Sequence, residues 1–203
     1  MIENYRTLPL GTYMKINAVL MGEGDELEKQ VQIIAILADK SPDEVLLLPL
    51  DDYAKFAAQT AFLREPCEPA DITPGWRYGD LIPTADFRKI NTAQYIDFQT
   101  FSKNFPASLP ELLSVFLVPD GHAYNDGYDI AEVQERVRAI PFPVALGLAA
   151  FFFVRFSELI ADSLTSLDSA IRRTKDTRKK EAMMRKMREV EELLRGVGAG
   201  LPM

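Results

Sequence analysis

Few residues of this 203-residue sequence combine a reactive side chain with neighbours that would activate it. The only histidine, His122, lies in the turn-rich stretch DGHAYNDG, which argues against a His-based triad and excludes multi-histidine metal sites. The only cysteine, Cys67, stands between Glu65 and Glu68, whose charges should raise the thiol pKa and weaken it as a nucleophile. The sequence contains neither a glycine-rich phosphate-binding loop nor the GxSxG motif that carries a nucleophilic serine. These observations predict a protein without enzymatic activity or a cofactor.

The acidic loop 120–129 is the one stretch that invites a test for metal binding. A calcium-binding EF-hand loop needs oxygen ligands at its first, third and fifth positions. Counted from Asp120, the third position is His122 and the fifth is Tyr124, so the pattern fails. The Asn, Asp and Gly residues of the loop are explained as turn formers, with Asp129 as a helix cap. We therefore predict no metal site.

Charge is distributed unevenly along the chain. The net charge is −7, which argues against a general nucleic-acid binder. Residues 172–188, the basic segment, hold nine Lys and Arg and two acids, a local charge of +7, so the rest of the chain carries −14. This asymmetry predicts either an electrostatic partner site or neutralisation of the acidic body by its own basic segment.

Compartment and membrane association are indicated by three features. A single cysteine favours a reducing cytoplasm, and the start of the sequence lacks the pattern of a signal peptide. The most apolar run, Phe142–Val154, is shorter than the roughly 20 residues that a spanning helix needs. Arg155 and Glu158 follow it directly. We expect a buried core helix here and no membrane association.

Helix signals dominate the chain. A first helix is expected over residues 9–21, with Thr12 as its cap, and three closely joined helices over Leu27–Leu63. Capping boxes formed by Ser41 with Glu44, and by Asn91 with Gln94, mark two helix starts. We expect helices over 92–104, within 108–118, from 129 to 139 and from 142 onwards.

The predicted fold is mainly α, a multi-helix bundle with a short β-hairpin near residues 76–90, where Pro83 restricts any strand to an edge. Two runs of apolar residues spaced 4-3-4, beginning at Ile160 and Met183, leave two alternatives open at the C-terminus, a helical hairpin or one long broken helix. The predicted organisation is an N-terminal helical part (1–64), a Pro/Gly-rich linker (65–90) and a C-terminal helical part (91–203). The predicted core residues are Ile34, Leu37, Phe56, Phe98, Phe116, Phe152 and Phe156.

The C-terminal basic segment and the residues that follow it are the candidate partner-binding site. Aromatic residues, which interleave with basic ones in many nucleic-acid readers, do not occur after Phe156. Methionines instead give the expected helix a soft apolar face suited to protein contacts. The predicted partner-binding residues are Arg178, Lys179, Lys180, Met183, Met187, Val190 and Leu194.

The segments LPLGTYMKINAVL and VQIIAILADKSPDEVLLLPLDDYAKF resemble the N-terminal region of tail assembly chaperones of long-tailed bacteriophages. The later stretches INTAQYIDFQTFSK and LLSVFLVPDGHAYNDGYDIAEVQERV are similar to tail-region proteins of phages and prophages, so the resemblance covers roughly residues 1–140. It implies a non-enzymatic protein of the host cytoplasm that keeps the tape measure protein soluble and recruits tail tube subunits during virion assembly.

Two other functions remain open at this stage. One is a structural component of the virion, such as a connector, neck or tail protein that stays in the particle. The other is a nucleic-acid-binding regulator that uses the basic C-terminal helix, whose binding would weaken steeply with salt. Besides tape measure and tail tube proteins, a second copy of the chain is a candidate partner.

Overall fold

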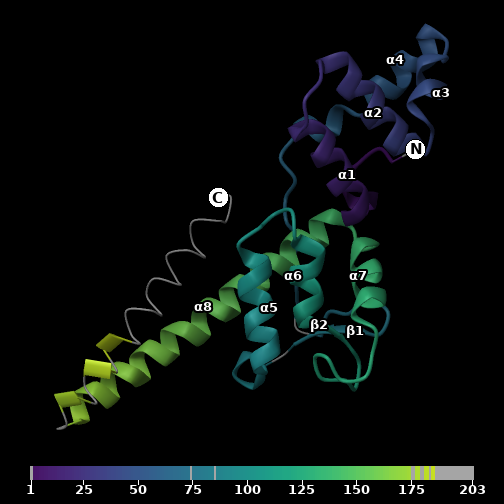
Figure 1. The fold of residues 1–203 in the computed structure, drawn as a ribbon. Coiled ribbons are helices and arrows are strands. Elements are labelled where there is room, and N and C mark those ends of the chain that lie inside the picture. Colours follow the sequence, from purple (N-terminus) through teal and green to yellow (C-terminus); the bar gives the residue numbers. More distant parts are fainter. Residues whose placement is uncertain are drawn as a thin grey trace.

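The computed structural model describes residues 2–73, 75–84, 86–174, 177–178, 181–182 and 184–185. The protein is mainly helical, as predicted, with a small antiparallel sheet and a long C-terminal helix (Figure 1). The helices are α1 (Leu10–Met21), α2 (Glu26–Ala38), α3 (Pro42–Leu46), α4 (Leu50–Gln59), α5 (Thr92–Ser102), α6 (Leu109–Phe116), α7 (Ile130–Arg138) and α8 (Phe142–Arg173), and the strands are β1 (Leu81–Pro83) and β2 (Leu117–Pro119).

Helices α1 to α4 form an N-terminal lobe, residues 2–64, in which α2 is the central element (Figure 1). One side of α2 packs Ile33 and Leu37 against Leu8 and Ile16, and the other packs Val31, Ile34 and Ala35 against Val45. The prediction of three closely joined helices is confirmed. The Ser41–Glu44 capping box starts α3, and Pro49 precedes α4. Thr12, however, lies inside α1, which begins after Pro9, so its predicted capping role is wrong.

The remaining helices build a body, residues 76–173, around α6. Every residue of α6 except Glu111 is buried. Six of the seven predicted core residues are buried, among them the four phenylalanines Phe98, Phe116, Phe152 and Phe156 of the body. Phe56 is the exception and is only half-buried, because α4 packs on α2 through one face and buries no residue completely.

The sheet joins segments that are far apart in the sequence. β1 lies in the region 76–90 where strand was expected, and it pairs antiparallel with β2, with Ile82 opposite Val118. The partner strand therefore comes from 117–119, directly after α6, and not from the same short region. The Asn91–Gln94 capping box opens α5 as predicted.

The lobe and the body are joined through α1 and the start of α8. Leu10 N–H donates to Ile140 O at 2.8 Å, and Phe142 N–H donates to Leu8 O at 2.8 Å. The ring of Tyr13 stacks on that of Phe142, with centroids 3.5 Å apart. Helix α1 thus contributes to the hydrophobic cores on both sides of this junction.

The chain returns from the lobe to the body through residues 65–77, which form no helix or strand where they are described. This segment packs directly on α8: Ala70 N–H donates to Pro143 O at 2.8 Å, and a Cβ built on Gly147 would lie 2.0 Å from Ala70 O. Gly147 therefore allows the backbone to approach α8 closely. The division into the parts 1–64, 65–90 and 91–203 stays a prediction.

Helix α8 ends at Arg173, with Thr174 as its C-cap. In the described chain it is long and apolar enough to span a membrane by length and composition. Its apolar residues Ala145, Leu148, Phe152 and Phe156 are nevertheless buried against protein, as in a core helix. The choice between a hairpin and a broken helix beyond Thr174 depends on residues outside the described ones.

Candidate functional site

The residues considered first for chemistry lie apart from one another. Cys67 is half-buried between the lobe and α8, and burial, followed by the charge of Glu68, raises the pKa of its thiol. The exposed His122 faces the backbone oxygen of Asp126, with Nδ1 at 3.0 Å. Among the described residues, no three His, Cys, Asp or Glu gather in a way that could hold a metal ion. The direction predicted for the Cys67 pKa is confirmed, although burial is its main cause.

Tyr124 is the most strongly perturbed titratable group of the body. Burial, reinforced by its hydrogen bond to Asp97 Oδ2 at 2.8 Å, raises the pKa of its phenol. The phenol therefore stays protonated at neutral pH and donates a structural hydrogen bond between the 120–129 loop and α5. Asn91 Nδ2 also donates to the Tyr124 carbonyl oxygen, which fixes the same loop. This arrangement holds the loop in place and offers no general base.

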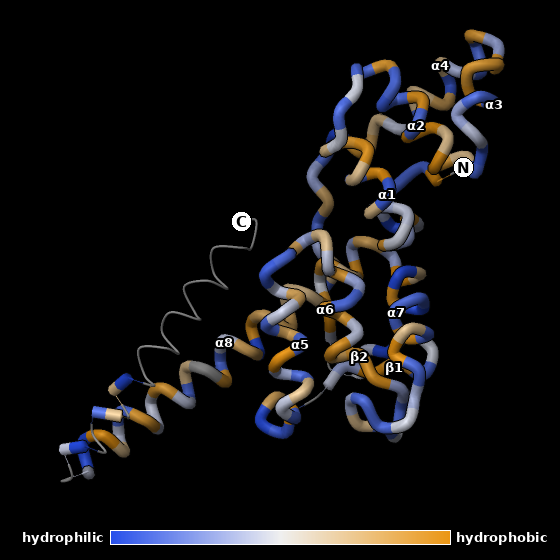
Figure 2. Tube along the Cα trace, viewed as in Figure 1, coloured by the Kyte–Doolittle hydropathy of each residue, from blue (hydrophilic) through white to orange (hydrophobic). Residues whose placement is uncertain are grey.

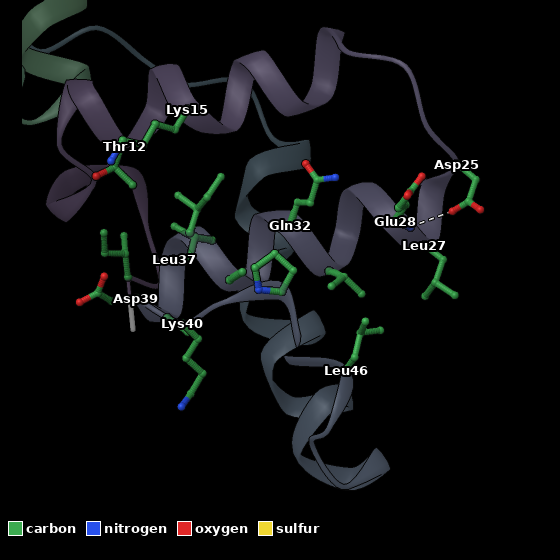
Figure 3. Close-up of a pocket in the computed structure, with 16 residues that line it drawn as sticks. Thr12, Lys15, Asp25, Leu27, Glu28, Gln32, Leu37, Asp39, Lys40 and Leu46 are labelled. Carbon is green, nitrogen blue, oxygen red and sulfur yellow. Dashed lines mark hydrogen bonds between the residues drawn. The ribbon is translucent and has the colours of Figure 1, made fainter. Parts of the chain in front are cut away.

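An open groove of about 1170 Å³ runs along α2, in the N-terminal lobe. Figure 3 shows Thr12 and Lys15 of α1 on one side of it and Leu37 on its floor. Asp25 and Leu27 mark one end of α2, and Asp39 and Lys40 mark the other. The groove is lined by Ile2, Thr12, Lys15, Asp25, Leu27, Glu28, Val31, Gln32, Ala35, Ile36, Leu37, Ala38, Asp39, Lys40, Pro42 and Leu46.

Beside this groove, three leucines of the α3–α4 connection point into solvent. We call them the leucine surface: Leu46 is 66%, Leu47 84% and Leu50 81% exposed. Leu46 also lines the groove, as does Leu27, which is 61% exposed. Figure 2 shows this stretch of apolar residues between polar ones. Single exposed leucines are ordinary, but three within five residues beside a groove indicate a contact surface.

The stretch of chain that supplies most of the groove and the leucine surface is acidic. Residues 23–52, which include α2, α3 and the start of α4, hold nine Asp and Glu and two Lys, a net charge of −7. Most of these acids are exposed, including Glu28 and Asp39 in the groove itself. The groove lining itself holds Asp25, Glu28 and Asp39 together with Lys15 and Lys40, so a ligand that covers the groove would meet apolar residues and a small excess of negative charge.

The predicted partner-binding residues fall mostly outside the described part of the chain. Lys179, Lys180, Met183, Met187, Val190 and Leu194 lie outside the described residues. Arg178 is described, and it is an exposed residue in helical conformation. The groove is formed by other residues, near the N-terminus.

The sequence contained a usable signal for this surface. In VLLLPLDD, Val45 and Leu48 face the core of the lobe while Leu46, Leu47 and Leu50 do not. A helix as short as α3 cannot bury four consecutive apolar side chains, because it presents only one face to its neighbour. This run contains more apolar residues than one buried face can hold, and that excess could have indicated an exposed apolar patch.

The chain was compared with protein-family models, with curated proteins and with solved structures, and it matches none of them. The functional argument therefore depends on the fold and on the surface of the N-terminal lobe.

Proposed function

We propose that this protein is a non-enzymatic assembly chaperone of a bacteriophage tail, which binds the tape measure protein and tail tube subunits through the N-terminal lobe. The exposure of Leu46, Leu47 and Leu50 beside the α2 groove carries the proposal. A groove with apolar anchors suits an amphipathic helix of another protein. The resemblance of the sequence to tail assembly chaperones supports the choice of partner.

The acidic residues of the stretch 23–52 give this binding surface a preference for basic partners. A helix with an apolar face and basic flanks would be attracted to residues 23–52 and then anchored by the leucines. Covering such a helix would keep an aggregation-prone partner in solution until its assembly. This is the action expected of a chaperone, and it needs no catalytic group.

The test is co-expression with the long helical protein encoded by the neighbouring gene. We expect that protein to be soluble with the wild-type chain and insoluble with the triple variant L46S/L47S/L50S. The matched control is I96S/V154S, which replaces two apolar residues of the body that are 54% and 57% exposed. If the triple variant keeps the partner soluble as well as the control does, the leucine surface is not the binding site and the proposal fails.

A protein inventory of purified particles separates the chaperone from a structural virion component. A chaperone should be absent from finished particles or far below the copy number of the tail tube protein. Stoichiometric presence would instead identify a component that stays in the virion.

A further inference from the structure

We propose that the groove and leucine surface of the N-terminal lobe bind the basic C-terminal segment of a second copy of this chain. The inference rests on the proposed function in one respect: it assigns a resting occupant to the surface that the partner would use. A partner helix would then displace the segment from the groove.

Charge is the first argument for this occupant. Residues 23–52, which supply most of the residues that line the groove, carry −7, and the basic segment, residues 172–188, carries +7. Both regions are short, and their net charges are equal and opposite in a chain that is acidic elsewhere. Complementary potentials of this kind favour association and fix its orientation.

Apolar character is the second argument. Along a helix, Met183, Met187, Val190 and Leu194 follow a 4-3-4 spacing and would form one apolar stripe. The groove offers a matching floor and rim in Val31, Leu37 and the exposed Leu27 and Leu46. Apolar residues on both partners would be covered, with Lys and Arg of the segment next to Glu28 and Asp39 of the lobe.

Distance disfavours the segment of the same molecule when that segment is helical. Phe142 adjoins α1, and the 32 residues of α8 then carry the chain about 48 Å away from this junction. Folded back as a helix, residues 174–194 would span about 31 Å, which is too short to reach the junction. The groove lies farther still, across α1. A second copy can supply the segment without this restriction.

The experiment uses the full chain and two charge-reversal variants, with self-association measured by sedimentation equilibrium. The lobe variant is E28K/D39K and the segment variant is R178E/K179E/K180E. For each variant alone we expect the dissociation constant to rise at least tenfold. The wild type should associate at low ionic strength and lose this association in about 1 M salt, where the Debye length is only about 3 Å.

Mixing the two variants gives the decisive result. The segment variant keeps its lobe charge of −7 and the lobe variant keeps its segment charge of +7. In the mixture these two unchanged surfaces meet, so the two variants should associate again. The control variant D126K/E132K reverses two charges of the body and should associate like the wild type. Circular dichroism of each variant checks that the helices are retained.

Two results would overturn the inference: a wild-type chain that is monomeric at low salt, or variants that stay monomeric when mixed. Either can occur while L46S/L47S/L50S still loses the tail partner, in which case the proposed function stands and only the self-docking is wrong. If the mixture associates but the triple variant still solubilises the partner, the self-docking stands and the proposed function fails.

Discussion

Phe152 is fully buried and lies at the centre of the phenylalanine cluster of the body. Its ring centroid is 5.0 Å from that of Phe116 and 6.1 Å from that of Phe87. Replacing it with alanine should reduce the free energy of unfolding by about 3–5 kcal/mol, because a cavity replaces the ring. Urea unfolding measures this loss. V154A, an exposed position on the same helix, should change it by no more than about 0.5 kcal/mol, and equal effects would contradict the burial of Phe152.

Asp80 connects the turn before β1 to α7 through an ion pair with Arg136. The hydrogen bond from Arg136 is the main reason why the pKa of Asp80 lies below its usual value of 3.8. The folded state therefore binds fewer protons than the unfolded state, so the pair stabilises the fold above about pH 4 and loses this effect as the pH falls further.

The variant D80N should consequently lose less stability than the wild type on acidification below about pH 4. Thermal unfolding measured at several pH values checks this. The same substitution at Asp126, an exposed residue of the 120–129 loop, serves as the control. If D80N and the wild type follow parallel curves down to low pH, the ion pair does not contribute.

At the scale of elements, helix starts could be predicted from the sequence and strand pairing could not. The boxes at Ser41 and Asn91 depend on residues three positions apart, so the local sequence contains the whole signal. The end of α6 depends instead on β1: Leu117 turns extended and pairs with Pro83, which lies 34 residues earlier. The apolar run SLPELLSVFLV gives no local sign of that change.

Gln94 shows the same limit of prediction from local sequence, because this one side chain makes both a predicted and an unpredicted hydrogen bond. Its amide oxygen accepts from Asn91 N–H at 3.2 Å, which the capping box predicted. Its amide nitrogen also donates to Val115 O at 3.0 Å, near the end of α6, a contact between helices that no local pattern indicates. Because Gln94 is buried, it ties α5 to α6 as well as capping α5.

Replacing Gln94 with alanine should therefore cost about 1–3 kcal/mol, since the carbonyl of Val115 is left buried without its donor. The variant Q94E keeps an acceptor for the cap but has no donor when ionised, so it should be at least as destabilised. E44A, in the exposed capping box of α3, should cost less than either. Chemical unfolding compares the three, and a harmless Q94E would show that the bond to Val115 is unimportant.

Helix α8 and the returning segment 65–77 make a second contact between elements that can be tested. The approach of Ala70 O to Gly147 leaves no room for a Cβ. At an open helical position, glycine to alanine stabilises by about 1 kcal/mol, but G147A should destabilise by about 1–3 kcal/mol through overpacking. Limited proteolysis should cut the segment near Ala70 faster in G147A. A stabilised variant would mean that the segment does not rest on α8.

For the whole molecule, the question is whether the lobe and the body unfold together. Their junction has two backbone hydrogen bonds, Leu10 to Ile140 and Phe142 to Leu8, and the stack of Tyr13 on Phe142. Since α1 supplies core residues to both sides, opening the lobe also exposes part of the body core. We expect the wild type to unfold in a single calorimetric transition.

The variant F142A tests that coupling. It keeps both backbone bonds but removes the ring that packs on Tyr13, so the lobe should unfold first and a second transition should appear. Hydrogen exchange should then be faster in α2 than in α6, whereas both should exchange through one global opening in the wild type. F98A, a buried position within the body, is the matched control: it should lower the stability and leave one transition. If F142A also unfolds in one step, the coupling lies in the backbone bonds. Two transitions in the wild type would instead mean that the lobe is an independent unit, free to present its groove without the body.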